Sequence, residues 1–541
     1  MRMEAGYLSR LAAEQYGDSV ALTGPNGSLT FTELNQRANR IGSATRSLGA
    51  TPGDRIGVLA YNRPEVVESW LGFEKHALVR VVLHSHFDMA AHVASLNHVG
   101  AVGLLFDTRF VDQVDAARSQ LHTVRHFVAL GDDCPDWAVS YEDLVASGDP
   151  EDQYLSVDED APCFLQLTSG TTGLPKAWTK TYRSWLAVIN QNLHHLDTFG
   201  AAPPVSQDDV NLHFHPLQWA SGFQTLYPYL VRGARTVVVD DSSFDPDGLV
   251  DTLVGEGVTG TLMPGPLLSP VLDVVQARGG IEHRMRRMVV FFATPEQLHR
   301  TTQVLGAVWC HGFGSTEQGA VTTRLLPGDV AQGPERIGSV GRVAAPMIEV
   351  AVVDASGRRQ PAGAVGEIVV RSPMSQGYYW GLPEKTASSY FADDWFRPED
   401  VGYLDDDGFL YYSDRAADTI TLEAGAVYPH LVEAAVLAHE AVANCGVVGL
   451  GPDGDIRVVA AVQLMPGIED SGALRELILK AAADRLRGFE RPAEVVVVGE
   501  LPTVLGGAKV QRGESCVPGW PGRRTDDSRR TNAPRAACCG G

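Results

Sequence analysis

The stretch that most constrains the fold and chemistry of this chain reads Thr168-Ser169-Gly170-Thr171-Thr172-Gly173-Leu174-Pro175-Lys176. A short apolar run, residues 164–167, precedes it and predicts a buried strand. Glycine lets the following backbone approach a polyphosphate closely, and the hydroxyl groups add hydrogen-bond donors. Lys176 supplies a positive charge at the end of the segment. The sequence therefore predicts a phosphate-binding loop, although most Gly/Ser/Thr clusters are ordinary exposed turns.

This loop does not follow the Walker pattern. That pattern requires Gly directly before Lys, and this chain has Pro175 in front of Lys176. A nucleotide chemistry different from that of the Walker-type proteins is therefore expected.

Size and charge narrow the classes of protein further. At 541 residues the chain exceeds the length at which one hydrophobic core stops growing, so two or more domains are expected. A net charge of −22 argues against nucleic-acid partners and acidic membranes, and local donors must hold any polyanion such as ATP. The chain shows neither an apolar run of about 18 residues nor an apolar signal-peptide core at its start. We therefore expect a cytoplasmic enzyme with no membrane partner.

Strand-like and helix-like segments alternate through the first 300 residues. An amphipathic helix is expected over residues 30–49, with Thr32 as its cap. Strands are expected at residues 55–60, 79–83, 102–106, 236–239 and 288–292. Such alternation predicts an α/β fold with mostly parallel sheets covered by helices.

The pattern of expected secondary structure changes after about residue 345, where short strands alternate with tight turns such as Asp405-Asp406-Asp407-Gly408. We expect a large N-terminal domain over residues 1–413 and a smaller α+β domain over residues 414–515. Residues 516–541 are rich in Pro, Gly and Arg, which predicts a disordered tail.

A second motif reads His311-Gly312-Phe313-Gly314-Ser315-Thr316-Glu317. Its glycine spacing does not match a dinucleotide-binding fingerprint, because the third glycine comes too late. Taken alone, a Gly/Ser/Thr turn that ends in Glu is typical of a helix N-terminus, where the carboxylate interacts favourably with the dipole.

Together, the two motifs resemble the signatures of the adenylate-forming, or AMP-binding, superfamily. This superfamily includes acyl- and aryl-CoA synthetases, adenylation domains and beetle luciferases. The resemblance extends to about residue 515. It implies a large N-terminal α/β domain, a small mobile C-terminal domain, and a site for ATP and Mg²⁺.

The resemblance also implies roles for individual residues. The phosphates of ATP would be cradled by Thr168, Ser169, Gly170, Thr171, Thr172, Gly173 and Lys176. In the second motif, Phe313 would stack on adenine next to Gly314, Thr316 would contact the α-phosphate, and Glu317 would hold Mg²⁺. These chemistries fit, because an aromatic face suits a purine and a carboxylate suits a hard cation.

Three further residues in the C-terminal part match family positions. Asp400 would accept hydrogen bonds from the ribose hydroxyls, and Arg415 would reach ribose or phosphate, unless it only forms a surface ion pair. Lys509, on the loop Gly506-Gly507-Ala508-Lys509, would join Thr168, Lys176 and Glu317 as a catalytic residue by bridging the carboxylate and the α-phosphate. An ordinary exposed lysine is the alternative for Lys509.

The acid-binding pocket is expected around His215, Trp219, Gly222 and His311. Counted from Pro216 and Gly222, Trp219 occupies the position of the family's usual histidine, where it could line an apolar acyl or aryl group or simply belong to the core. His213 and His215 could equally be core residues, because a metal site would need a third ligand.

These resemblances predict an ATP-dependent ligase that activates a carboxylic acid as an acyl-adenylate and releases pyrophosphate. The acyl group would then pass to the thiol of CoA or of the phosphopantetheine arm of an acyl carrier protein. Ala417 stands where the family usually has Asp or Lys at its hinge, so transfer to an amine remains an alternative. A nucleotide-binding protein without turnover and a luciferase-like oxygenase are further alternatives.

Overall fold

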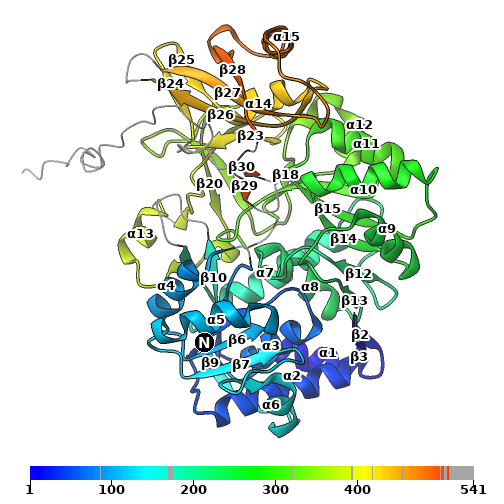
Figure 1. The fold of residues 1–541 in the computed structure, drawn as a ribbon, viewed down its shortest axis with the longest axis vertical. Helices are drawn as coiled ribbons and strands as arrows, with labels where there is room; N and C mark the ends of the chain where they lie inside the picture. Colours follow the sequence, from blue (N-terminus) through cyan, green and yellow to red (C-terminus); the bar gives the residue numbers. More distant parts are fainter. Residues whose placement is uncertain are drawn as a thin grey trace, which may run out of the picture. The chain divides into compact units, whose positions relative to one another are not determined.

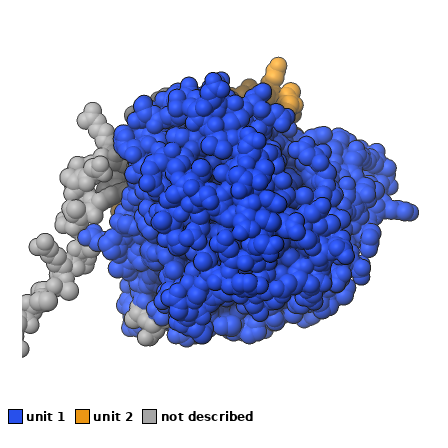
Figure 2. Space-filling view, turned by 90° about the horizontal axis from the view of Figure 1, so that it is seen from below, with its two compact units in different colours: residues 1–398, 402–412 blue, residues 399–401, 413–541 orange. Residues whose placement is uncertain are grey.

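The computed structural model describes residues 1–85, 87–168, 175–319, 321–391, 394–416, 418–451, 456–499, 501, 503–504 and 509–510. The chain divides into two compact units, residues 1–398 with 402–412 and residues 399–401 with 413–541, which are coloured separately in Figure 2. The predicted phosphate-loop residues 169–173 and the predicted tail lie outside the described residues.

One large sheet of the first unit has eight strands in the order β21-β11-β10-β5-β4-β6-β7-β8. Their bounds are Tyr378–Tyr379, Lys176–Thr181, Pro162–Thr168, Val79–Val82, Arg55–Leu59, Gly103–Asp107, His126–Leu130 and Val139–Ser140. The strands from β10 to β8 run parallel, whereas β11 is antiparallel to both of its neighbours. The strand predicted before the phosphate loop is β10, which is buried along most of its length because both faces of the sheet are covered.

The other large sheet has nine strands in the order β18-β17-β16-β15-β14-β12-β13-β2-β3. Their bounds are Arg342–Val343, Thr323–Leu325, Trp309–Phe313, Arg287–Phe291, Gly260–Pro264, Val210–His213, Arg235–Val238, Val20–Gly24 and Gly27–Thr30. The strands from β16 to β2 are parallel to one another. The prediction of mostly parallel sheets is therefore confirmed.

Helices cover both sheets (Figure 1). Their bounds are Tyr7–Tyr16 (α1), Phe31–Ser47 (α2), Pro64–Lys75 (α3), Met89–Val99 (α4), Val111–Ala117 (α5), Tyr141–Ser147 (α6), Tyr182–Asp197 (α7), Ala220–Leu230 (α8), Pro246–Gly255 (α9), Gly265–Ala277 (α10), Pro295–Leu305 (α11), Pro327–Gln332 (α12) and Pro383–Ser388 (α13). The helix expected over residues 30–49 is α2, but its cap is Thr30 and not Thr32. Thr30 and Glu33 form a reciprocal capping box, which fixes the helix start two residues earlier.

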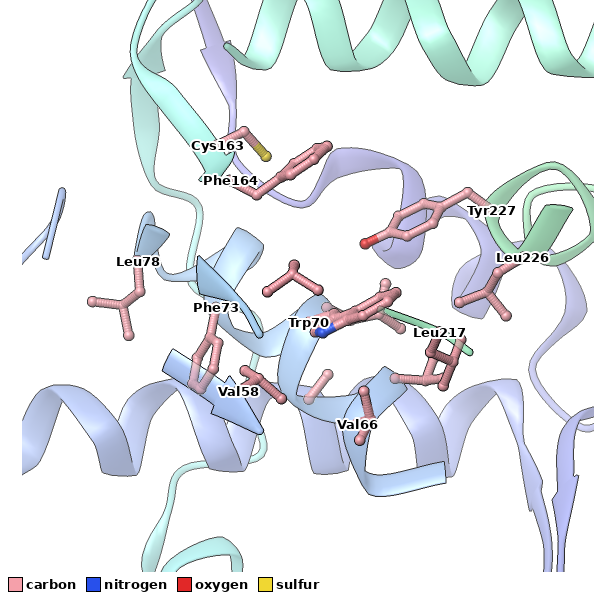
Figure 3. Close-up of a cluster of buried hydrophobic side chains, with 14 of the residues drawn as sticks. Val58, Val66, Trp70, Phe73, Leu78, Cys163, Phe164, Leu217, Leu226 and Tyr227 are labelled. Atoms are coloured by element: carbon pink, nitrogen blue, oxygen red, sulfur yellow. The ribbon is translucent and has the colours of Figure 1, made fainter. Parts of the chain in front are cut away.

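A buried cluster joins the two sheets through α3, β10 and α8, and Figure 3 shows Trp70, Phe164 and Tyr227 in it. The guanidinium of the buried Arg80 lies 4.5 Å from the ring centroid of Trp70 and 4.4 Å from that of Phe164. Arg80 donates to the Tyr227 hydroxyl, and this hydroxyl donates to Glu74. The buried charge is thereby partnered, as burial requires.

A smaller four-stranded sheet follows, with order β19-β20-β22-β23 and bounds Glu349–Val353, Gly366–Arg371, Asp400–Leu404 and Leu410–Arg415. The second unit contains β24 (Ile420–Leu422), β25 (Gly425–Val427), α14 (Pro429–Leu437), β26 (Val442–Leu450), β27 (Arg457–Leu464), α15 (Gly472–Ala483), β28 (Glu494–Val497), β29 (Thr503–Val504) and β30 (Lys509–Val510). Helices α14 and α15 share one apolar core with the sheet β26-β27-β28.

Candidate functional site

The predicted site residues of the first unit follow the carboxyl ends of parallel strands. Strands β12, β14, β15 and β16 end at His213, Pro264, Phe291 and Phe313, and they are paired in parallel register. The carboxyl ends of parallel strands meet at one edge of a sheet, where α/β proteins bind their ligands. The segments with His215 and Trp219, after β12, and with Glu317, after β16, therefore leave the sheet at the same edge.

Both ends of the predicted phosphate loop are fixed by a hairpin. Strand β10 ends at Thr168, β11 begins at Lys176, and these two residues are paired across the antiparallel ladder. The Thr168 hydroxyl donates to the Lys176 carbonyl at 3.3 Å. Because β10 is parallel to β5, Thr168 also lies at the carboxyl edge of its sheet.

Two hydrogen bonds hold the carboxylate of Glu317, which lies in the acidic turn after β16. Ser315 Oγ donates to Oε2 at 3.1 Å, and Tyr379 Oη donates to Oε1 at 2.9 Å. The amide of Gly319 closes the turn by donating to the Ser315 carbonyl at 3.0 Å. Gly314, Thr316 and Glu317 are half-buried in this turn.

Two residues that the sequence analysis did not single out connect this turn to the hairpin. Lys180, on β11, donates through Nζ to the Glu317 carbonyl at 2.9 Å. Tyr379, on β21, is paired with Trp178 of β11, and its ring packs edge-on against the indole at a centroid distance of 4.9 Å. The structure thus brings Glu317 beside the strand that begins at Lys176, although the two motifs are far apart in sequence.

Phe313 is the last residue of β16 and is 8% exposed. It packs with Val352, Ile368 and Leu410, and its ring centroid lies 5.9 Å from that of Tyr412. His311 lies two residues earlier, so its side chain projects from the same face of β16 as Phe313. Stacking of Phe313 on adenine stays a prediction.

The predicted acid-pocket segment is clamped by Asn62, which lies three residues beyond β4. The Asn62 side chain donates to the His215 carbonyl at 2.8 Å and accepts from the Leu217 amide at 2.7 Å. His215 is buried, and its ring centroid is 4.1 Å from that of the buried His213. Burial lowers the pKa of His213 well below its usual value, so this imidazole is neutral at physiological pH.

Trp219 and Gly222 shape the start of α8. Trp219 is half-buried and precedes the first residue of the helix. The Gly222 amide donates to the Trp219 carbonyl at 2.9 Å. Phe292, which the sequence analysis did not propose for the pocket, follows β15 with 58% of its surface exposed and a φ of 60°, a conformation uncommon outside glycine.

In the second unit, Asp400 and Arg415 form an ion pair with Arg415 Nε 3.1 Å from Asp400 Oδ1. Asp400 is buried and Arg415 is half-buried. Lys509 begins β30 and is paired with Val504 of β29. Their predicted roles toward ribose, phosphate and the acid stay predictions.

The donor set at Glu317 suits Mg²⁺. Each carboxylate oxygen accepts one protein hydrogen bond and keeps lone-pair capacity for a cation. Within the described part of the chain, no three His, Cys, Asp or Glu side chains gather as a metal cage. Mg²⁺ commonly binds one or two carboxylates together with substrate phosphates and water, so a single glutamate beside the hairpin of the predicted phosphate loop fits this ion.

Comparison with known proteins settles the family. Residues 9–380 match the model of the AMP-binding enzyme family, and residues 431–505 match that of the AMP-binding enzyme C-terminal domain. The chain belongs to the AMP-binding enzyme family. It is an AMP-forming, acid-activating ligase, and the predicted two-part adenylate-forming architecture is confirmed.

Relatives of this AMP-binding enzyme differ in their substrates and acyl acceptors. It is 28% identical to a long-chain-fatty-acid–CoA ligase of Thermus thermophilus, over 91% of this chain and 90% of the relative. It is also 28% identical to a fatty acid–[acyl-carrier-protein] ligase of Streptomyces coeruleorubidus, over 90% of each. The solved structure of an amide bond synthetase from Marinactinospora thermotolerans is 25% identical, with a TM-score of 0.80 over 93% of this chain and 98% of that one.

No helix in the described ranges combines the length and the apolar character needed to span a bilayer.

Proposed function

We propose that this AMP-binding enzyme activates an apolar acyl or aryl carboxylic acid with ATP and transfers the acyl group to a thiol, that of CoA or of a carrier-protein phosphopantetheine arm. The observation that carries the proposal is the link between the two motifs. Lys180 and Tyr379 hold the Glu317 turn beside the strand that starts at Lys176. A carboxylate held beside the strand that follows the predicted phosphate loop suits the handling of Mg·ATP.

In the first step, a carboxylate oxygen of the acid attacks the α-phosphorus of ATP. An O–P bond forms, the bond between the α-phosphorus and the bridging oxygen breaks, and pyrophosphate leaves with the electron pair. The repulsion between the acid and the phosphates opposes this step, and fixed positive charge lowers its barrier. We assign the positive charge to Lys176 and Lys509. The hydroxyl groups of Thr168, Ser169, Thr171 and Thr172 and the backbone of Gly170 and Gly173 would add hydrogen bonds to the phosphates.

Mg²⁺ held by Glu317 would offset phosphate charge when bound. The Tyr379 and Ser315 hydroxyls fix the orientation of the Glu317 carboxylate in advance, so its binding of a cation costs little reorganisation. Thr316, in the same turn, would contact the α-phosphate, and Phe313 would border the nucleobase. Asp400 and Arg415 would contact the ribose.

In the second step, the thiol sulfur attacks the acyl carbon of the adenylate. A C–S bond forms, the C–O bond to the phosphate breaks, AMP leaves, and the thiol proton passes to solvent. We propose that the small domain, residues 414–515, reorients against residues 1–413 between the steps, as the family resemblance implies. The tail over residues 516–541 has no assigned part.

The proposal of an apolar acid is supported by side chains near the carboxyl edge of the nine-stranded sheet. Trp219 is half-buried, Phe292 is exposed, and the buried His213 is neutral. Two aromatic side chains and an uncharged imidazole favour the body of an acyl or aryl group over a second carboxylate. His215, Gly222 and His311 complete the proposed pocket.

Transfer to an amine is the second candidate acceptor reaction. It is favoured by the likeness to the amide bond synthetase and by Ala417, which departs from the usual residue at the hinge. In that reaction a C–N bond would form in place of the C–S bond, and the amine would lose its proton.

The test is exchange of labelled pyrophosphate into ATP with a panel of benzoates, cinnamates and fatty acids of increasing length. The acids that support exchange are then incubated with CoA, with a phosphopantetheinylated carrier protein or with primary amines. Mass spectrometry identifies the products. We expect exchange with at least one apolar acid and a thioester product. Exchange without a thioester but with an amide would replace the thiol, and absence of exchange with every acid would overturn the proposal.

A further inference from the structure

Lys180 is a fully buried lysine on β11, between the predicted phosphate loop and the acidic turn. Its side chain lies on the same face of the strand as that of Trp178, because residues two apart in a strand share a face. Burying a lysine removes the water around its ammonium group and is costly unless the group finds partners. Such a residue in a strand therefore calls for an explanation.

Both partners of Lys180 are backbone carbonyls on other segments. Nζ donates to the Glu317 carbonyl at 2.9 Å and also to the Met374 carbonyl. Met374 belongs to the 3₁₀ turn Pro373–Ser375, which precedes β21 and Tyr379. One amine thus joins β11 to the turn that carries Glu317 and to the segment that leads into Tyr379.

The turn leaves room for this amine through Gly319. Gly319 has a φ of 80°, and a Cβ placed there would lie 2.9 Å from Lys180 Nζ and 2.7 Å from a methyl carbon of Val188. A residue with a side chain would displace the lysine, whereas glycine accepts both the conformation and the close approach. Gly319 thus leaves the space that Lys180 Nζ needs in order to reach the backbone carbonyl of Glu317.

From these contacts we infer that Lys180 is a positioning residue for the reaction: it holds the backbone of Glu317 at the distance from the β10–β11 hairpin that binding of Mg·ATP requires. The inference rests on the proposed function, because it assigns Lys180 a role through Glu317 and Mg²⁺. Burial lowers the pKa of Lys180 to about 7, with Glu317 opposing the shift. A neutral amine still carries two N–H donors, enough for two carbonyls, so the contact does not depend on the charge.

Lys180→Met tests this role, since methionine keeps an unbranched chain but has no donor. The matched control is Lys75→Met, which removes another buried lysine, whose Nζ bonds to Asn35 and Asp152. Hydrogen exchange of the peptide over residues 313–319 reports the turn directly, without substrate. In Lys180→Met we expect these amides to exchange at least about tenfold faster, and in Lys75→Met we expect them to match the wild type.

The second readout is binding of ATP with and without Mg²⁺ by titration calorimetry. Adding Mg²⁺ should raise the affinity for ATP of Lys180→Met at least about tenfold less than it raises that of the wild type. Metal-free ATP should bind both proteins equally. A merely structural lysine would lower the melting temperature and leave this difference unchanged, as we expect of Lys75→Met. If Lys180→Met does not fold, Lys180→Gln, which retains N–H donors at a shorter reach, takes its place and should give smaller effects.

The outcomes separate this inference from the proposed function. The inference would be overturned if the Lys180 variant showed wild-type rates of hydrogen exchange over residues 313–319. A wild-type effect of Mg²⁺ on its binding of ATP would also overturn it. Failure of the wild-type protein to exchange pyrophosphate with any acid would overturn the proposed function, and the hydrogen-exchange result would still decide whether Lys180 holds the turn.

Discussion

The Tyr379 hydroxyl donates a hydrogen bond of 2.9 Å to Oε1 of Glu317, across 62 residues of sequence. Strand β21 fixes this tyrosine by pairing with β11, and Trp178 and Phe396 form one apolar cluster with its ring. The carboxylate is therefore oriented by Ser315 of its own turn and by Tyr379, which lies on a strand outside that turn. This arrangement fixes the orientation of the Glu317 carboxylate, which we propose as a ligand of Mg²⁺.

Glu317→Gln should weaken the binding of the Mg²⁺ that supports pyrophosphate exchange. Glutamine keeps an oxygen that can accept from Tyr379, but it loses the negative charge that a hard cation prefers. We expect the Mg²⁺ concentration for half-maximal exchange to rise by at least about tenfold. Glu335→Gln, at an exposed position, should match the wild type. An unchanged Mg²⁺ titration in Glu317→Gln would contradict the assignment.

Lys509→Ala should abolish adenylate formation while ATP binding persists. The lysine is proposed to offset negative charge at the reacting centre, where charge is most concentrated in the transition state, so we expect a loss of at least about 100-fold in exchange rate. Equilibrium binding of ATP should change little. Lys480→Ala, which removes an exposed lysine of α15, is the matched control. Adenylation at the wild-type rate in Lys509→Ala would remove the role given to this residue.

The local sequence predicts the strands of the two large sheets well, because buried parallel strands are continuous apolar runs. The run at residues 164–167 lies within β10, and the run at 288–292 overlaps β15 closely. The expected cap of α2 is wrong by two residues, since Thr30 and Thr32 are both plausible caps and only the contact with Glu33 decides between them.

The candidate site shows where such prediction ends. A motif identifies Glu317, but a lysine in a strand such as Lys180 would ordinarily be assigned to an exposed face. Its burial depends on carbonyls of residues 317 and 374, which only the folded chain brings together. Likewise, Asn62 clamps His215 across 153 residues, and nothing in its local sequence indicates that contact. For Tyr379, the aromatic run Tyr378-Tyr379-Trp380 is the one feature of the local sequence that indicates a buried strand.

Asp241 provides a pH-dependent prediction. Its Oδ1 accepts from the Asn62 amide at 2.6 Å, and burial raises the pKa of its carboxyl from 3.8 to about 7, with this hydrogen bond opposing the shift. Between these two values the folded chain holds a proton that the unfolded chain has released. Unfolding therefore releases a proton, and the contribution of Asp241 to stability is lost as the pH rises toward 7.

Asp241→Asn should remove this loss, because asparagine keeps the acceptor for Asn62 without ionising. The variant should gain in free energy of unfolding relative to the wild type as the pH rises from 5 to 8, by roughly 2 kcal/mol at a slope of at most about 1.4 kcal/mol per pH unit. Denaturant unfolding at each pH measures it. Asp406→Asn, at an exposed turn position, should show no such trend. A difference that stays constant or shrinks with pH would contradict the raised pKa.

Gly222→Ala tests the segment proposed to line the acid pocket. A Cβ at residue 222 would lie 2.2 Å from the Leu217 carbonyl oxygen, and Leu217 cannot yield easily because its amide donates to Asn62. We expect the turn that carries Trp219 to be displaced, with a loss of about 1–3 kcal/mol in the free energy of unfolding. The KM for the acid should then rise more than the KM for ATP, since this turn carries Trp219 of the proposed acid pocket and none of the residues proposed to contact ATP.

Gly255→Ala is the matched control, because residue 255 ends α9 and an added Cβ meets open space. Alanine is favoured over glycine in a helix, so this variant should keep or slightly raise stability, by at most about 1 kcal/mol. Its KM values for acid and ATP should equal those of the wild type. If Gly222→Ala lowered stability but left the ratio of the two KM values unchanged, the turn before α8 would be part of the core and not a wall of the pocket, and Trp219 would lose its proposed contact with the acid.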